Sequence, residues 1–74
     1  MNVAIDIGNT RTKIGIFNDN NLSTVMTYEN DKKINLKEII SNLQVENAII
    51  SSTIEIPAYL VEDFQQIKQH FILD

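Results

Sequence analysis

The residues of this chain best suited to chemistry lie close together near its amino terminus, in the stretch DIGNTRTK from Asp6 to Lys13. An isolated buried carboxylate is costly, so Asp6 is expected at a strand end near water, beside a cation or backbone donors. Gly8 leaves room for backbone amides to approach an anion, and Asn9 and Thr10 add side-chain donors. Lys13 adds a mobile positive charge. This set would suit Mg²⁺ at Asp6 and nucleotide phosphates at the turn.

The same residues have a purely structural interpretation. Gly8-Asn9 is a good hairpin turn, and Asp6 could be an acid that is hydrogen-bonded to that turn. Spacing alone leaves both interpretations open, because short motifs often arise by chance.

The elements around this stretch follow from hydrophobic periodicity. Alternating residues at 3–7 and 13–17 predict two strands joined as a hairpin by Gly8-Asn9. The turn-rich run 18–21 leads into the strand-favouring residues 22–28, which predict a third antiparallel strand.

A helix is expected where the period changes to about 3.6 residues. The apolar positions that define it are Leu36, Ile39, Ile40 and Leu43. Asn35 is placed as the N-cap, with Glu38 as its capping-box partner three residues later.

The second half of the chain predicts a strand, a helix and a further strand. The continuous run Ala48-Ile49-Ile50, followed by Ser51-Ser52, is typical of a parallel strand buried on both faces. Pro57 would open the helix at its first position. The apolar stripe that follows it consists of Leu60, Val61, Phe64, Ile67 and Phe71. Residues 71–73 look like the start of the last strand.

The resulting order β-β-β-α-β-α-β predicts an α/β fold with a mixed sheet, arranged as a ribonuclease-H-like core that is incomplete at the C-terminus. Both helices are placed to make the crossovers that parallel strands require. Ligands of such sheets gather beyond the carboxyl ends of the strands, where Asp6 and Ser51-Ser52 would both lie. A chain of 74 residues holds one small core, so residues 1–74 are expected to form one lobe without a second.

Composition excludes several classes of function. The chain has no cysteine, which excludes disulfides and thiolate metal sites. Its net charge of −4 argues against a nucleic-acid partner, and Lys32-Lys33 is interpreted as a solvated pair. No apolar run approaches the roughly 18 residues needed to span a bilayer, and no secretory signal is present, so a cytoplasmic protein without membrane contact is expected. His70 stands alone and is interpreted as structural, and Arg11 as an exposed strand residue.

The stretch DIGNTRTK fits the pattern Asp-x-Gly-Asn-Thr-x-x-Lys and resembles the first phosphate-binding motif of the type III pantothenate kinases. These enzymes belong to the superfamily of sugar kinases, actin and heat-shock ATPases, whose lobes are built on ribonuclease-H-like cores. The segment AIISSTIEIP from Ala48 to Pro57 is similar to the strand and Ser-Ser loop that follow the first helix in that family. The resemblance covers nearly the whole chain and only the opening part of a family member.

The resemblance implies a parent enzyme that phosphorylates pantothenate with ATP, the first step of coenzyme A biosynthesis. It also implies Mg²⁺, a monovalent cation (K⁺ or NH₄⁺) and a homodimer. Asp6 would organise the Mg²⁺ and the phosphates of ATP; Gly8, Asn9 and Thr10 would form the phosphate-contacting turn, which Lys13 would approach. In the family the catalytic base, the pantothenate contacts and the monovalent-cation ligands come from later sequence. We therefore expect no catalytic residue in this chain, which is interpreted as the N-terminal part of a nucleotide-binding lobe and as inactive alone.

Two other functions stay open. A metal-dependent nuclease on the same core would need several converging carboxylates. Asp6 and Glu38 are available, but the strand after the first helix ends in Ser51-Ser52, where a further acid would be needed. A non-catalytic interaction or regulatory module would retain the fold without the chemistry. The full-length sequence would separate the kinase from the regulatory module, because it would show whether a catalytic base exists.

Overall fold

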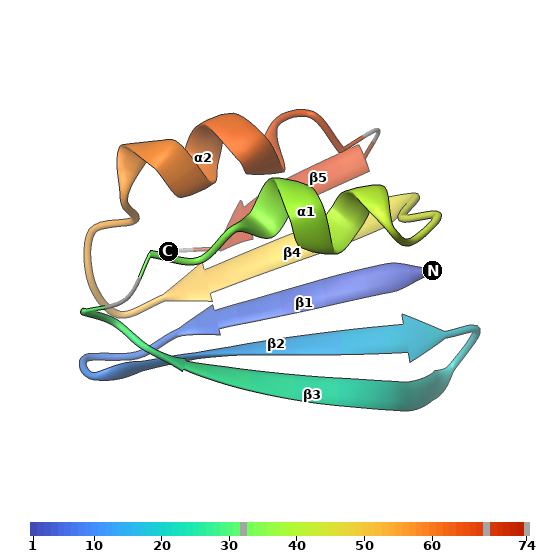
Figure 1. The fold of residues 1–74 in the computed structure, drawn as a ribbon, viewed down its shortest axis with the longest axis horizontal. Helices are drawn as coiled ribbons and strands as arrows, with labels where there is room; N and C mark the ends of the chain where they lie inside the picture. Colours follow the sequence, from blue (N-terminus) through green and yellow to red (C-terminus); the bar gives the residue numbers. More distant parts are fainter. Residues whose placement is uncertain (32, 68, 74) are drawn as a thin grey trace.

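The computed structural model describes residues 1–31, 33–67 and 69–73, which form a small mixed α/β domain with a five-stranded sheet and two helices (Figure 1). Its elements are β1 (Asn2–Ile7), β2 (Arg11–Asn18), β3 (Asn21–Glu29), α1 (Leu36–Ser41), β4 (Asn47–Ser52), α2 (Ala58–Phe64) and β5 (Gln69–Leu73). The predicted order of elements is confirmed. Lys32 lies outside the described residues, and with it half of the predicted lysine pair.

The strands lie in the order β3-β2-β1-β4-β5, which places the first strand at the centre of the sheet (Figure 1). β1 to β3 pair antiparallel, whereas β4 is parallel to both β1 and β5. Short turns suffice for the antiparallel pairs, and the parallel pairs use α1 and α2 in their connections. At the β2–β3 turn, Asp19 has a φ of 57°, a left-handed conformation that short polar side chains tolerate. The predicted set of three antiparallel strands continued by parallel ones is confirmed.

The core lies on one side of the sheet, under both helices. Every second residue of the central strands is buried there; the strand members of the core are Val3, Ile5, Ile7, Ile14, Ile16, Ala48 and Ile50. From the helical side, Leu36, Leu60 and Phe64 pack against them with at most 2% of their surface exposed. Strand alternation and helical periodicity thus meet in one apolar layer.

No described helix packs on the opposite face of the sheet, here called the open face. The prediction that residues 48–50 form a strand buried on both faces is wrong, since Ile49 is 36% exposed while its neighbours Ala48 and Ile50 are buried. In register with Ile49, Phe71 of β5 is 61% exposed. The reason is that both helices pack on the same side of the sheet, which leaves the other side of β4 to solvent.

The first helix begins as predicted. The Asn35 Oδ1 accepts a hydrogen bond from the Glu38 amide at 3.1 Å. The return bond differs from a standard capping box, because Glu38 Oε2 accepts from the Asn35 side-chain amide at 3.1 Å and not from its backbone. Helix α1 ends at Ser41, so Leu43 packs on the core from the turn beyond the helix.

The second helix starts one residue later than predicted. Pro57 is its N-cap, with φ −56° and ψ 137°, and Ala58 is the first helical residue. Leu60 and Phe64 form the buried part of the expected stripe, but Phe71 belongs to β5 and lies on the open face. Within the described residues, no helix is long and apolar enough to cross a membrane.

His70 has a structural role, as predicted. Its Nδ1 lies 3.0 Å from the carbonyl oxygen of Ile67, and its ring meets Phe64 edge-on with 5.4 Å between centroids. These contacts attach the start of β5 to the end of α2.

Candidate functional site

Asp6 lies in a row of polar side chains that crosses the open face at the carboxyl end of β1. It pairs in register with Lys13 on β2 and with Ser51 on β4. Residues opposite one another on neighbouring strands point to the same face, so these three side chains share one side of the sheet. All three are exposed. The prediction that Asp6 and Ser51 meet at this end of the sheet is confirmed.

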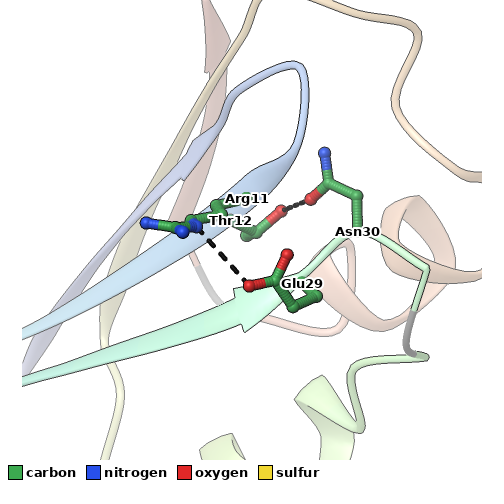
Figure 2. A network of polar contacts seen from close by, with 4 residues as sticks. All are labelled: Arg11, Thr12, Glu29 and Asn30. Carbon is green, nitrogen blue, oxygen red and sulfur yellow. Dashed lines mark hydrogen bonds and ion pairs between the residues drawn. The ribbon is translucent and has the colours of Figure 1, made fainter.

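Asp6 and Lys13 carry opposite charges on neighbouring strands. Within the described residues they form no ion pair, although their strands place them side by side. The neighbouring row does hold one, between Arg11 Nε and Glu29 Oε1 at 3.5 Å (Figure 2). Its side chains are 64% and 59% exposed, so this pair contributes little to stability, as expected for an exposed strand arginine. Asp6 and Lys13 therefore remain accessible to a charged ligand.

Beside this row, Asn9 and Thr10 form the exposed turn between β1 and β2. Their amide nitrogens donate no hydrogen bond to the described residues. Two unused donors on adjacent residues make a turn suited to an anion.

Gly8 closes the hairpin, which agrees with the structural interpretation of Gly8-Asn9 as a hairpin turn. Its amide donates to the carbonyl of Arg11 at 2.9 Å and closes the hairpin, so it is not a free donor for phosphate. A Cβ at this position would lie 3.2 Å from the same carbonyl oxygen, closer than most such contacts. The missing side chain thus serves the close approach of the two strands, while its φ is not positive.

The structure adds Asn30, which follows β3 directly, to the residues of this site. Its Nδ2 donates to the Gly8 carbonyl at 2.7 Å, and its backbone amide donates to the Thr10 carbonyl at 2.9 Å. Its Oδ1 accepts from the Thr12 hydroxyl at 2.7 Å (Figure 2). Thr12 is 2% exposed and is the buried polar residue of the described core. Sequence reasoning missed both residues, since no local pattern links position 30 to positions 8–12.

Asp6 fits the kind of Mg²⁺ site in which phosphates supply most of the ligands. Mg²⁺ commonly binds one or two carboxylates together with substrate phosphates and waters. The described residues hold no group of three or more His, Cys, Asp or Glu side chains that could hold a metal ion. Where a nucleotide brings Mg²⁺, Asp6 would be the carboxylate of the protein that holds it.

The two acids considered for a nuclease are not brought together. Glu38 lies on α1, where it bonds to Asn35, and α1 packs on the covered side of the sheet. Asp6 faces the open side. Ser52, in turn, caps the loop after β4, because its Oγ donates to the Ile54 carbonyl at 2.6 Å and accepts from the Ile54 amide at 3.2 Å.

A hollow of about 550 Å³ lies on the helical side, away from the Asp6 row. Its lining includes Lys33, Lys37 and Tyr59. The Tyr59 hydroxyl accepts from the Ile34 amide at 3.1 Å, and Lys33 Nζ stands 5.1 Å from the centre of the Tyr59 ring. Lys33 and Tyr59 thus already have partners within the protein, and none of the three residues belongs to the Asp6–Lys13 stretch.

The fold and site define a small mixed α/β domain with an exposed acid, lysine and donor-rich turn at the carboxyl end of its central strand. No protein-family model matches the chain, and comparison with curated proteins gives no significant match. Its function is therefore argued from the motif and from the geometry that surrounds it.

Proposed function

We propose that this chain is the ATP phosphate-binding part of an ATP-dependent small-molecule kinase. One observation carries the proposal: Asp6 and Lys13 are paired in register, exposed, and adjacent to a turn with two amides that have no acceptor among the described residues. A carboxylate for Mg²⁺, a cation for phosphate and backbone donors are the groups that hold a metal-bound triphosphate.

The topology supports a nucleotide-binding lobe with a ribonuclease-H-like core. In the order β3-β2-β1-β4-β5 the first strand is central, with antiparallel pairs on one side of it and parallel pairs on the other, and this arrangement supports the proposed core. In sheets of this kind ligands bind beyond the carboxyl ends of the parallel strands. Asp6 and Ser51 lie at that end.

The chemistry that the site can support is phosphate positioning. Phosphoryl transfer depends mainly on placing the acceptor, metal and phosphates together and on neutralising charge. Lys13 would offset phosphate charge, the Asn9 and Thr10 amides would orient the phosphate oxygens, and Asp6 would hold a magnesium-bound water or Mg²⁺ itself. A bound Mg²⁺ supplies further charge neutralisation. The acceptor site and the catalytic base would come from other sequence of a parent enzyme.

The resemblance of DIGNTRTK to the type III pantothenate kinases makes pantothenate the proposed acceptor in that parent. It carries with it the proposals of a K⁺ or NH₄⁺ site outside this chain, a homodimer and a cytoplasmic location. With phosphate-binding residues alone, the chain itself is proposed to be inactive as a kinase.

A non-catalytic interaction module is the second candidate, and the open face favours it. On this face Val25, Phe71 and Leu73 are 53%, 61% and 52% exposed, and exposed apolar side chains of this kind can serve as a binding surface for another protein. An interaction module would not need Asp6 and Lys13 to be free, so nucleotide binding separates the two proposals.

Titration of the chain with ATP, with and without Mg²⁺, tests the proposed function. Asp6→Asn should weaken ATP binding about tenfold in the presence of Mg²⁺ and little in its absence, because the amide keeps the size but loses the charge that attracts the metal. Asp19→Asn is the matched control, since Asp19 lies in the turn at the other end of the sheet and asparagine tolerates its left-handed φ.

Two results would count against the proposal. Absence of ATP binding by the unmodified chain would favour the interaction module, and equal effects of the two asparagine variants would remove the specific role of Asp6. In a full-length parent, Asp6→Asn should lower the turnover of pantothenate with ATP. If the parent enzyme uses ATP but does not phosphorylate pantothenate, only the proposal that pantothenate is the acceptor is refuted.

A further inference from the structure

We infer that Asn30 is the residue that positions the phosphate-binding turn. This inference rests on the proposed function and extends it to a residue outside the DIGNTRTK stretch. Asn30 reaches both ends of the turn, because its side chain binds the Gly8 carbonyl at 2.7 Å and its backbone amide binds the Thr10 carbonyl at 2.9 Å. The turn is thereby fixed from the end of β3 and not only by its own hairpin.

Through the geometry of the peptide bond, these contacts set the direction of the Asn9 N–H. In a planar trans peptide the carbonyl oxygen and the following N–H point in opposite directions. With the Gly8 carbonyl directed at Asn30, the Asn9 N–H points away from Asn30. That amide has no acceptor among the described residues. Asn30 thus aims a free donor outward.

The second contact acts in the same way on the other side of the turn. The Thr10 carbonyl is held by the backbone of Asn30, which fixes the peptide between Thr10 and Arg11. Between the two fixed peptides lies the Asn9–Thr10 peptide, which forms no hydrogen bond with the described residues. The turn is restrained at its ends and keeps its central amide available.

Two partners together hold the Asn30 side chain in one orientation. The Gly8 carbonyl can only accept, so the Nδ2 end of the Asn30 side chain faces it. The Thr12 hydroxyl then donates to Oδ1 at 2.7 Å (Figure 2). Because Thr12 is only 2% exposed, water has little access to compete for its hydroxyl. Donor and acceptor of the Asn30 side chain are both satisfied in a single orientation.

Asn30→Asp is the substitution that isolates this role. The aspartate can still accept from Thr12, but an oxygen then faces the Gly8 carbonyl where a donor stood. We expect the Asn9 amide resonance to shift and its hydrogen exchange to change, and the affinity for Mg²⁺-ATP to fall about tenfold. Asn47→Asp is the matched control: it makes the same change in charge and also removes an amide donor, the 3.0 Å bond to Asn2 at the far end of the sheet. It should alter ATP affinity less than about twofold.

Thr12→Val provides a second test that does not depend on the first variant folding. Valine has nearly the shape of threonine and suits a buried strand position, so the change removes the hydroxyl that donates to the Asn30 Oδ1. It should shift the Asn9 resonance and weaken ATP binding in the same direction. Urea unfolding establishes that each variant used is folded. Unmoved Asn9 and Thr10 resonances, or unchanged ATP affinity in a folded Asn30→Asp or Thr12→Val chain, would overturn the positioning role.

The two proposals fail in different ways. If the unmodified chain does not bind ATP, the proposed function is wrong, whatever the variants do to the turn. If it binds ATP and the folded variants bind equally well, the proposed function stands and the role of Asn30 is refuted.

Discussion

Replacing Lys13 with methionine should weaken the binding of Mg²⁺-ATP by roughly five- to thirtyfold. Methionine keeps most of the apolar stem and removes the charge. Two unit charges about 4 Å apart interact by about 1 kcal/mol in water and about 4 kcal/mol at an effective dielectric constant near 20. Lys13 is exposed on the open face, which favours the lower part of this range, about 1–2 kcal/mol.

Isothermal titration calorimetry at low and high salt measures this effect. Because exposed charges are screened, the difference between the unmodified chain and Lys13→Met should shrink as salt rises. Lys37→Met is the control, since Lys37 is an exposed lysine on α1, on the covered side of the sheet. Its affinity should stay within about twofold of the unmodified chain.

The result that would refute this reasoning is equally specific. If the charge of Lys13 interacts only with Asp6 inside the protein, Lys13→Met will change the free energy of unfolding and leave the affinity for ATP unchanged. A loss of affinity below about twofold, or the same loss in Lys37→Met, would show that Lys13 does not contact phosphate.

Three further predictions concern stability and association. Phe64→Ala should remove about 3–5 kcal/mol from the free energy of unfolding, because Phe64 is fully buried. Urea denaturation should then show a chain that is close to unfolded, whereas Phe71→Ala, at an exposed position, should change the free energy of unfolding little. Asn35→Ala should cost about 1 kcal/mol in the same assay through loss of the helix cap, and an unchanged midpoint would contradict that role. The chain should associate through the exposed edge strand β5, so sedimentation should show a mass that rises with concentration and falls in Phe71→Lys; a monomer at all concentrations would refute it.

The sequence by itself determined the kinds of element and their order. Alternation at residues 3–7, the turn-rich run 18–21 and the Asn35 cap each depend on neighbours within a few positions, so the local pattern contains what is needed to predict them. The same holds for the place of Asp6, since a residue near the end of a strand is at the end of the sheet once that strand forms.

Only the tertiary structure decided which face of the sheet is covered. The apolar run around Ile49 has the composition of a doubly buried strand, but a sheet face is buried only if another element packs on it. Both helices pack on one side, so Ile49 and Phe71 face solvent. An apolar sequence favours burial, but it does not determine which element of the fold will cover it.

The tertiary structure also decided how the candidate site is held. Asn30 lies 22 residues from Gly8 in the sequence and reaches it only because β3 returns along β2 to the end where the turn lies. The Gly8 amide is used by the hairpin itself, where it donates to the Arg11 carbonyl. Residue types near one another can indicate a site, but hydrogen-bond partners depend on strand register, which is fixed when the whole sheet assembles.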